Sequence, residues 1–262
     1  MDLSTETATA RARAFLTDYR DVISQHLETV RSTSADAILR AGTAVAQKVA
    51  ESGVVYVYGP GAHSTLAAQE IFFRAGGLAN ISAILDDGTL MSSGALRSMA
   101  IERLPGYGRI VIDDNRLGVG DLLILVNAYG INAVVIDATL RAHELGATVI
   151  GVSSRLHAES TTADHPARHP SKANLHDIVD IHVDTCIPVG DAVMQHEAVE
   201  QRFAPISTFA GAFALNSIVS CAIILLAEAG IAPPVLRSGN APGGDDVTKR
   251  LLAPLRDRMR WL

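Results

Sequence analysis

The chain has 262 residues, of which 48% are hydrophobic, 19% charged and only 5% aromatic. This length provides one large domain or two small ones, and the apolar content excludes intrinsic disorder. The net charge of −6 argues against a nucleic-acid partner, because phosphate backbones bind to basic surfaces. Two cysteines are too few for a disulfide framework, and the N-terminus lacks the apolar run of a signal peptide. We therefore expect a cytoplasmic protein.

The first 53 residues are expected to form a helical extension packed on the domain that follows. Apolar residues recur there at helical spacing in two stretches, which predicts two helices over residues 7–52. Ser34 or Asp36 would cap the second helix, and Gly53 would end it. No helix-turn-helix DNA reader is evident in this extension.

Residues 54–245 are expected to form an α/β domain. Short apolar runs typical of buried strands alternate with helical segments; they occupy residues 54–58, 122–126, 148–152 and 178–183. The pattern predicts a doubly wound parallel sheet with helices on both faces. Residues 88–119 break the rhythm and are interpreted as an insertion or mobile cover. A C-terminal helix is predicted over residues 246–262.

A segment without charged residues, 203–227, is long enough to span a bilayer. Polar residues such as Asn216 and Ser217 interrupt it, Pro205 lies near its start, and neither end carries Trp or Tyr. We therefore expect a core helix and no association with a membrane.

Polar loops follow three of the predicted strands. Their candidate ligand-binding residues are Gly59, Gly61, His63, Ser64, Asn127, Tyr129, Asn132, Ser153 and Ser154. Ligands of open parallel sheets bind beyond the carboxyl ends of the strands, and a helix N-terminus after such a loop favours an anion. The third glycine of a dinucleotide fingerprint and the lysine of a Walker motif are missing. The loops thus predict a small-anion or sugar site without a nucleotide cofactor.

The order of these motifs resembles the sugar isomerase (SIS) domain, which binds phosphosugars. The resemblance spans about residues 10–255, and further motifs resemble one bacterial subfamily: Arg103–Tyr107, Arg168–Ser171, Pro188–Ala192, Pro205–Gly211 and Gly243–Asp245. It implies a five-stranded, flavodoxin-type parallel sheet and a homodimer or tetramer whose sites are shared between subunits. Residues 126–129 stand where the family carries phosphate-binding serines. We therefore expect either a phosphate shifted toward Ser64 and Ser153 or a different polar substrate.

Aldose–ketose isomerisation needs a base that moves a proton between adjacent carbons, and an acid that opens the sugar ring. Glu70 could reach the site from the helix that follows Ser64, and its alternative role is that of a solvated helix carboxylate. Glu200 and Glu197 precede the position where related isomerases and etherases place a catalytic glutamate. His169 is the best acid/base candidate among the histidines, because its side chain titrates near neutrality.

Three further residues have two possible roles each. Arg168 could bind a substrate anion or form a surface salt bridge. Ser207 and Thr208 are expected to cap the long apolar helix and could contact phosphate as well. His165 and His169 have the spacing of a metal pair, but the intervening prolines disrupt a helix, so we predict no metal site.

The sequence therefore favours an isomerase-like enzyme acting on a sugar phosphate or an analogue of one. An etherase or deglycase would begin with the same proton abstraction and use the same residues. A ligand-sensing module without catalysis is the alternative from another class.

Overall fold

Five parallel strands form the centre of the molecule in the computed structural model, which describes residues 5–262. They are β1 (Val55–Tyr58), β2 (Ile81–Ile84), β3 (Leu122–Val126), β4 (Thr148–Ser153) and β5 (Ile181–Asp184), in the order β2-β1-β3-β4-β5. Val57 lies between Ala83 and Ile124 in the register. Every residue of β3 is buried, because helices cover both faces of the sheet. The predicted doubly wound, five-stranded sheet is confirmed.

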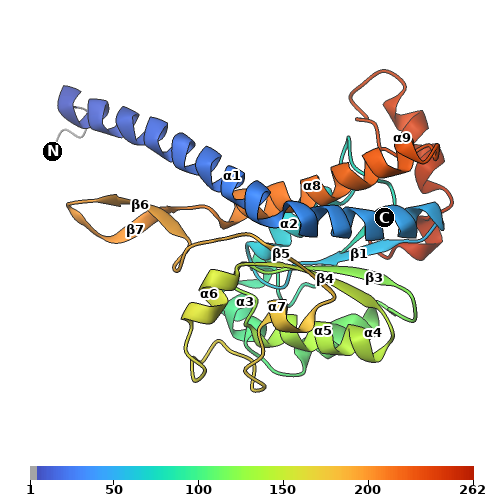
Figure 1. Cartoon of the computed structure of the whole chain (residues 1–262), viewed down its shortest axis with the longest axis horizontal. Helices are drawn as coiled ribbons and strands as arrows, with labels where there is room; N and C mark the ends of the chain where they lie inside the picture. Colours follow the sequence, from blue (N-terminus) through green and yellow to red (C-terminus); the bar gives the residue numbers. More distant parts are fainter. Residues whose placement is uncertain (1–4) are drawn as a thin grey trace.

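The helices form two layers around this sheet (Figure 1). One layer contains α1 (Glu6–Ala50), α2 (Ser64–Ile71) and α8 (Ser207–Glu228), and the other contains α4 (Tyr107–Asp114), α5 (Ala133–Glu144) and α7 (Leu175–Ile178). Shorter elements complete the chain: 3-10 turns at Met91–Ser93 and Arg256–Arg258, and helices α3 (Ala95–Glu102), α6 (Arg155–Ser160) and α9 (Gly244–Leu252). Each layer buries its own apolar cluster against the sheet.

The N-terminal extension is one helix, so the prediction of two was wrong. The serines at its middle do not interrupt it, because their hydroxyl groups find partners. Ser32 donates to the carbonyl of Glu28, while Ser34 donates to the Asp184 carbonyl of β5 at 2.8 Å and accepts from the Asp184 amide. Ser34 is therefore a contact to the sheet and not a helix cap. Buried residues of α1 begin only at Val30, and the preceding half projects beside a β-hairpin (Figure 1). Residues 1–4 of the predicted extension lie outside the described residues.

Residues 88–119 are the helical crossover that leads from β2 to β3, so the interpretation as an irregular insertion was wrong. Its helix α4 packs on α5 so closely that a side chain at Gly108 would lie 2.2 Å from the carbonyl oxygen of Val134. Val111 and Ile112 are buried in the same layer. The helices of this crossover have only eight residues each and are separated by Pro105-Gly106, which hides their periodicity in the sequence.

A β-hairpin, which the sequence did not predict, precedes α8. It pairs β6 (Ala192–His196) with β7 (Val199–Pro205), so the charge-free helix begins at Ser207 and not at Phe203. By length and composition α8 could cross a membrane, and 44% of its most apolar window is buried. The helix packs against the sheet, α1 and α2, as expected of a core helix. At the C-terminus, α9 ends at Leu252, short of the predicted 262.

Candidate functional site

A cleft of about 640 Å³ opens beyond the carboxyl ends of β1, β3 and β4. The strand order reverses between β1 and β3, and ligands of open parallel sheets bind at such a reversal. The cleft is lined by residues from segments 61–64, 99–103, 127–132, 157–167 and 189–207. We call residues 99–103 the Glu102 wall and residues 157–167 the histidine wall.

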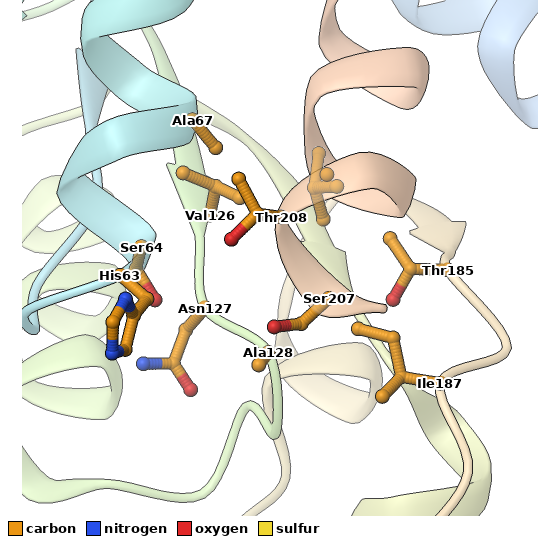
Figure 2. A pocket seen from close by; sticks show the side chains of 12 residues that line it. His63, Ser64, Ala67, Val126, Asn127, Ala128, Thr185, Ile187, Ser207 and Thr208 are labelled. Atoms are coloured by element: carbon orange, nitrogen blue, oxygen red, sulfur yellow. The ribbon is translucent and has the colours of Figure 1, made fainter. Parts of the chain in front are cut away.

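Three helices begin at this cleft, at Ser64 of α2, Asn132 before α5, and Ser207 of α8. A smaller cavity of about 30 Å³ adjoins the cleft between the first turns of α2 and α8 (Figure 2). Figure 2 shows the side chains of Ser64, Thr185 and Ser207 around it. The Thr185 hydroxyl is buried and has no hydrogen-bond partner within residues 5–262. Helix N-termini carry unpaired amides and a partial positive charge, so this end of the cleft favours an anion.

Two polar side chains hold the loops at this end of the cleft. Asn127 donates to the Pro60 carbonyl at 3.1 Å and accepts from the Gly130 amide at 2.8 Å, which ties the β1 loop to the β3 loop. Asp191 accepts from the Ser207 amide and the Ser207 hydroxyl, both at 2.7 Å. Asp191, and not Ser207 or Thr208, therefore caps α8, which corrects the prediction from sequence.

Glu102 is the only glutamate that lines the cleft within the described chain. It ends α3, and its carboxyl group lies against Gly61 so closely that a β-carbon there would be 2.7 Å from it. Burial raises the pKa of Glu102 to about 7, and the nearby Ala62 amide and Arg103 offset only part of this effect. Its position directly before the Arg103–Tyr107 motif was the signal available in the sequence.

An aromatic pair lies at the histidine wall. The rings of Tyr129 and His157 stack with centroids 3.5 Å apart and an interplanar angle of 17°. Burial lowers the pKa of His157, although the negative charge of Asp191 acts in the opposite direction. Burial thus favours the neutral form of the imidazole. No group of three or more metal-ligating side chains occurs among residues 5–262.

The structure brings together many of the predicted binding residues. Those that line the cleft are Gly61, His63, Ser64, Asn127, Tyr129, Asn132 and Ser207, and Thr208 lines the small cavity. Gly59 supports the first loop from behind, since a β-carbon there would meet the Ser64 carbonyl at 2.2 Å. Ser153 and Ser154 are fully buried, where they contact His182 and the Ile187 carbonyl and do not line the cleft.

The three glutamates predicted to be catalytic lie outside the cleft of a single chain. Glu70 contacts Arg74 at 3.3 Å and faces Asn216 of α8. Glu197 and Glu200 lie on the exposed β6–β7 hairpin, where water solvates both carboxylates. The separation arises because the unpredicted hairpin leads the chain away from the sheet before α8 returns to it.

His169 and Arg168 also have structural partners. The Nε2 atom of His169 lies 3.2 Å from the Asp137 carboxylate, and Nδ1 lies 2.7 Å from the Ser171 hydroxyl. The guanidinium of Arg168 donates to the carbonyls of Thr161 and Thr162 and to the side chain of Asn174. Neither side chain lines the cleft, and Arg168 forms no surface salt bridge within residues 5–262.

Comparison with known proteins assigns the chain to a family. The model of the SIS domain matches residues 18–154, which is just over half of the chain. Relatives match nearly the whole length. The UPF0309 protein GK1441 of Geobacillus kaustophilus is 34% identical over 244 residues, covering 93% of this chain and 95% of that protein. A UPF0309 protein of Streptomyces griseus is 38% identical over 235 residues, covering 89% and 92%.

The chain therefore belongs to the SIS domain family and, within it, to the bacterial UPF0309 group. Solved structures agree on the fold. A phosphoheptose isomerase from Francisella tularensis superposes with a TM-score of 0.52 at 17% identity, covering 83% of this chain and 98% of the other. A phosphoheptose isomerase from Neisseria gonorrhoeae gives 0.50 at 15% identity, covering 84% and 98%. At this identity the similarity defines the fold alone.

Proposed function

We propose that this protein binds a sugar phosphate or a close analogue in the cleft and moves a proton between two adjacent carbons of it. The observation that carries the proposal is the position of Glu102, a carboxyl group with a pKa near 7, in the same cleft as three helix N-termini. Membership in the SIS domain family supports a phosphosugar ligand, as do the structural neighbours named phosphoheptose isomerases.

In this proposal the phosphate lies at the first turn of α2. Backbone amides there, with the hydroxyls of Ser64 and Thr208, would hold the anion, and His63 borders the same space. The Ser207 amide and hydroxyl are bound to Asp191 and are not assigned to the phosphate. Residues 126–128, which stand where the family carries serines, line the small cavity at this position. Glu102 does not line that cavity, and two anions would repel each other at close range.

Glu102 would act as the base. Its carboxylate removes a proton from the carbon next to the carbonyl group, the C–H electrons form the C=C bond, and the carbonyl π electrons move to the carbonyl oxygen, which takes a proton from water to give an enediol. Glu102 then returns its proton to the former carbonyl carbon, while the hydroxyl on the adjacent carbon loses its proton to water and becomes the new carbonyl group. A carboxyl with a pKa near 7 suits this task, because the ionised form is present at neutral pH and the protonated form still gives its proton back. Glu102 replaces Glu70, Glu197 and Glu200, which do not reach the cleft within one chain.

The test combines binding with proton exchange. Hexose and heptulose phosphates are screened by thermal shift against the unphosphorylated sugars, and the ligands that bind are incubated with the protein in deuterated water. We expect exchange at one carbon by wild-type protein, and binding without exchange by Glu102→Gln. Glu200→Gln is the matched control and should exchange at the wild-type rate.

The alternatives have distinct outcomes in the same experiment. Binding without exchange by the wild type would overturn catalysis and leave a sensing module. Exchange accompanied by loss of a substituent from the sugar would indicate an etherase or deglycase. Failure of every phosphorylated sugar to bind would overturn the proposed ligand class.

A further inference from the structure

A buried carboxylate behind the cleft contacts two segments that are far apart in the sequence. Asp137 lies on α5 and is 6% exposed. Its Oδ2 atom accepts a hydrogen bond from the Gly106 amide at 2.5 Å, and its Oδ1 atom lies 3.2 Å from Nε2 of His169. Asp137 itself does not line the cleft. One side chain thus joins the end of the α3–α4 turn to His169, which follows the histidine wall by two residues.

The contact at Gly106 fixes the Glu102 wall. Gly106 follows Glu102 by four residues and precedes the first turn of α4 with φ +89°, a conformation that favours glycine. Two residues later, Gly108 lies directly on the backbone of α5. The start of α4 therefore has little freedom relative to α5, and the turn that follows Glu102 is tied to α5 by the Asp137 carboxylate.

The contact at His169 fixes the histidine wall. The His169 amide donates to the Ile131 carbonyl at 2.9 Å, and the imidazole is held between Asp137 and Ser171, with its side chain 12% exposed. The neighbouring Arg168 binds backbone carbonyls of the wall. A ring held on both sides is suited to orienting its neighbours and has no free nitrogen facing a ligand.

We propose that Asp137 is a positioning residue that holds the Glu102 wall and the histidine wall in a fixed arrangement, with His169 acting through it. The identity of the ligand in the cleft rests on the proposed function. The effect of Asp137 on the two walls can be measured without a ligand. A carboxylate suits this role, because its two oxygens face two separate N–H groups, the Gly106 amide and the His169 imidazole. An asparagine would turn an N–H₂ group toward one of these partners.

Hydrogen exchange of the full-length protein tests the coupling of the two walls. We expect Asp137→Ala to speed amide exchange at least tenfold in both 95–106 and 157–172, while α2 and α8 keep wild-type rates. Glu144→Gln is the matched control, since Glu144 also joins α5 to α4, through Arg109, but on the exposed surface. Wild-type exchange in either wall of the Asp137 variant would overturn the proposal. If Asp137→Ala does not fold, Asp137→Asn replaces it with the same expected outcome.

Two further measurements separate positioning from general destabilisation. His169→Gln retains an N–H donor at the position of Nε2, so it should restore wild-type exchange in 157–172 where His169→Ala does not. The pKa of Glu102, followed by carbon-detected NMR of its carboxyl, should fall by at least one unit in Asp137→Ala and stay unchanged in Glu144→Gln. Lack of rescue or an unchanged pKa would overturn the role of Asp137. Failure of the wild type to exchange protons into a sugar phosphate would overturn the proposed function alone.

Discussion

Replacing Glu102 by glutamine should make the protein more stable at alkaline pH and leave its stability at acidic pH nearly unchanged. Folding raises the pKa of this carboxyl from 4.5 to about 7, because burial disfavours the charged form. The folded state therefore binds the proton more tightly than the unfolded state does. The stability that this provides is complete below pH 4.5 and is lost as the pH rises through 7.

The magnitude follows from the two pKa values. Ionising Glu102 in the folded protein costs at most about 3 kcal/mol at 1.36 kcal/mol per pKa unit, and partial access of water reduces this to about 2 kcal/mol. Glutamine has nearly the same shape and no charge, so Glu102→Gln should gain about 2 kcal/mol over the wild type at pH 8. With an m-value of about 3 kcal/mol/M, the urea midpoint would rise by roughly 0.7 M.

The assay is urea unfolding of the wild type, Glu102→Gln and Glu200→Gln at pH 4.5 and pH 8. Glu200 is exposed on the hairpin, so its variant should follow the wild type at both pH values. Equal stability of the wild type and Glu102→Gln at pH 8 would refute the reasoning, since the carboxyl would then be as well solvated in the cleft as in the unfolded chain.

Three other predictions follow from buried contacts. Burial lowers the pKa of His182 to about 4, so the protein should lose up to about 3 kcal/mol of stability as the pH falls from 6.5 to 4. His182→Gln should flatten this pH dependence in urea titrations, and an unchanged dependence would contradict the prediction. Gly61→Ala should lower stability by about 1–3 kcal/mol, because Gly61 has φ +113° and a β-carbon would press on the Glu102 carboxyl. A Gly61→Ala variant that melts at the wild-type temperature would exclude that clash. Asp191→Ala should cost about 1–2 kcal/mol by removing the cap of α8, and Asp191→Asn, which keeps an acceptor, should recover part of the loss in the same unfolding assay.

Local sequence patterns predicted the sheet and the loops at its edge. The strands β1 and β3 are continuous apolar runs and β4 has an apolar centre, and such runs have few alternatives to burial between two helical layers. The loops at Gly61, Asn127 and Asn132 could be placed as well, because the carboxyl ends of parallel strands share one edge of a sheet. Most of the predicted ligand-binding residues therefore line the cleft.

A local sequence pattern could not predict which of the catalytic candidates line the cleft. Apart from its position directly before the Arg103–Tyr107 motif, Glu102 looks like any helix carboxylate in the sequence. Its raised pKa arises from packing against the Gly61 loop, 41 residues earlier in the chain. Glu200 precedes α8 in the sequence, but it lies on the β6–β7 hairpin, which carries it away from the site. Arg168 binds backbone carbonyls, and His169 contacts Asp137. The spacing of these residues in the sequence does not predict either contact.

The sequence by itself determined that this chain is an α/β protein with polar loops at one edge of its sheet, because the apolar runs of the strands and the order of the loops are local properties. Only the tertiary structure decided which titratable groups line the cleft and which contact the segments around it. Desolvation and hydrogen-bond partners set the chemistry of Glu102, Asp137 and His169, and both depend on segments that meet only when the chain is folded.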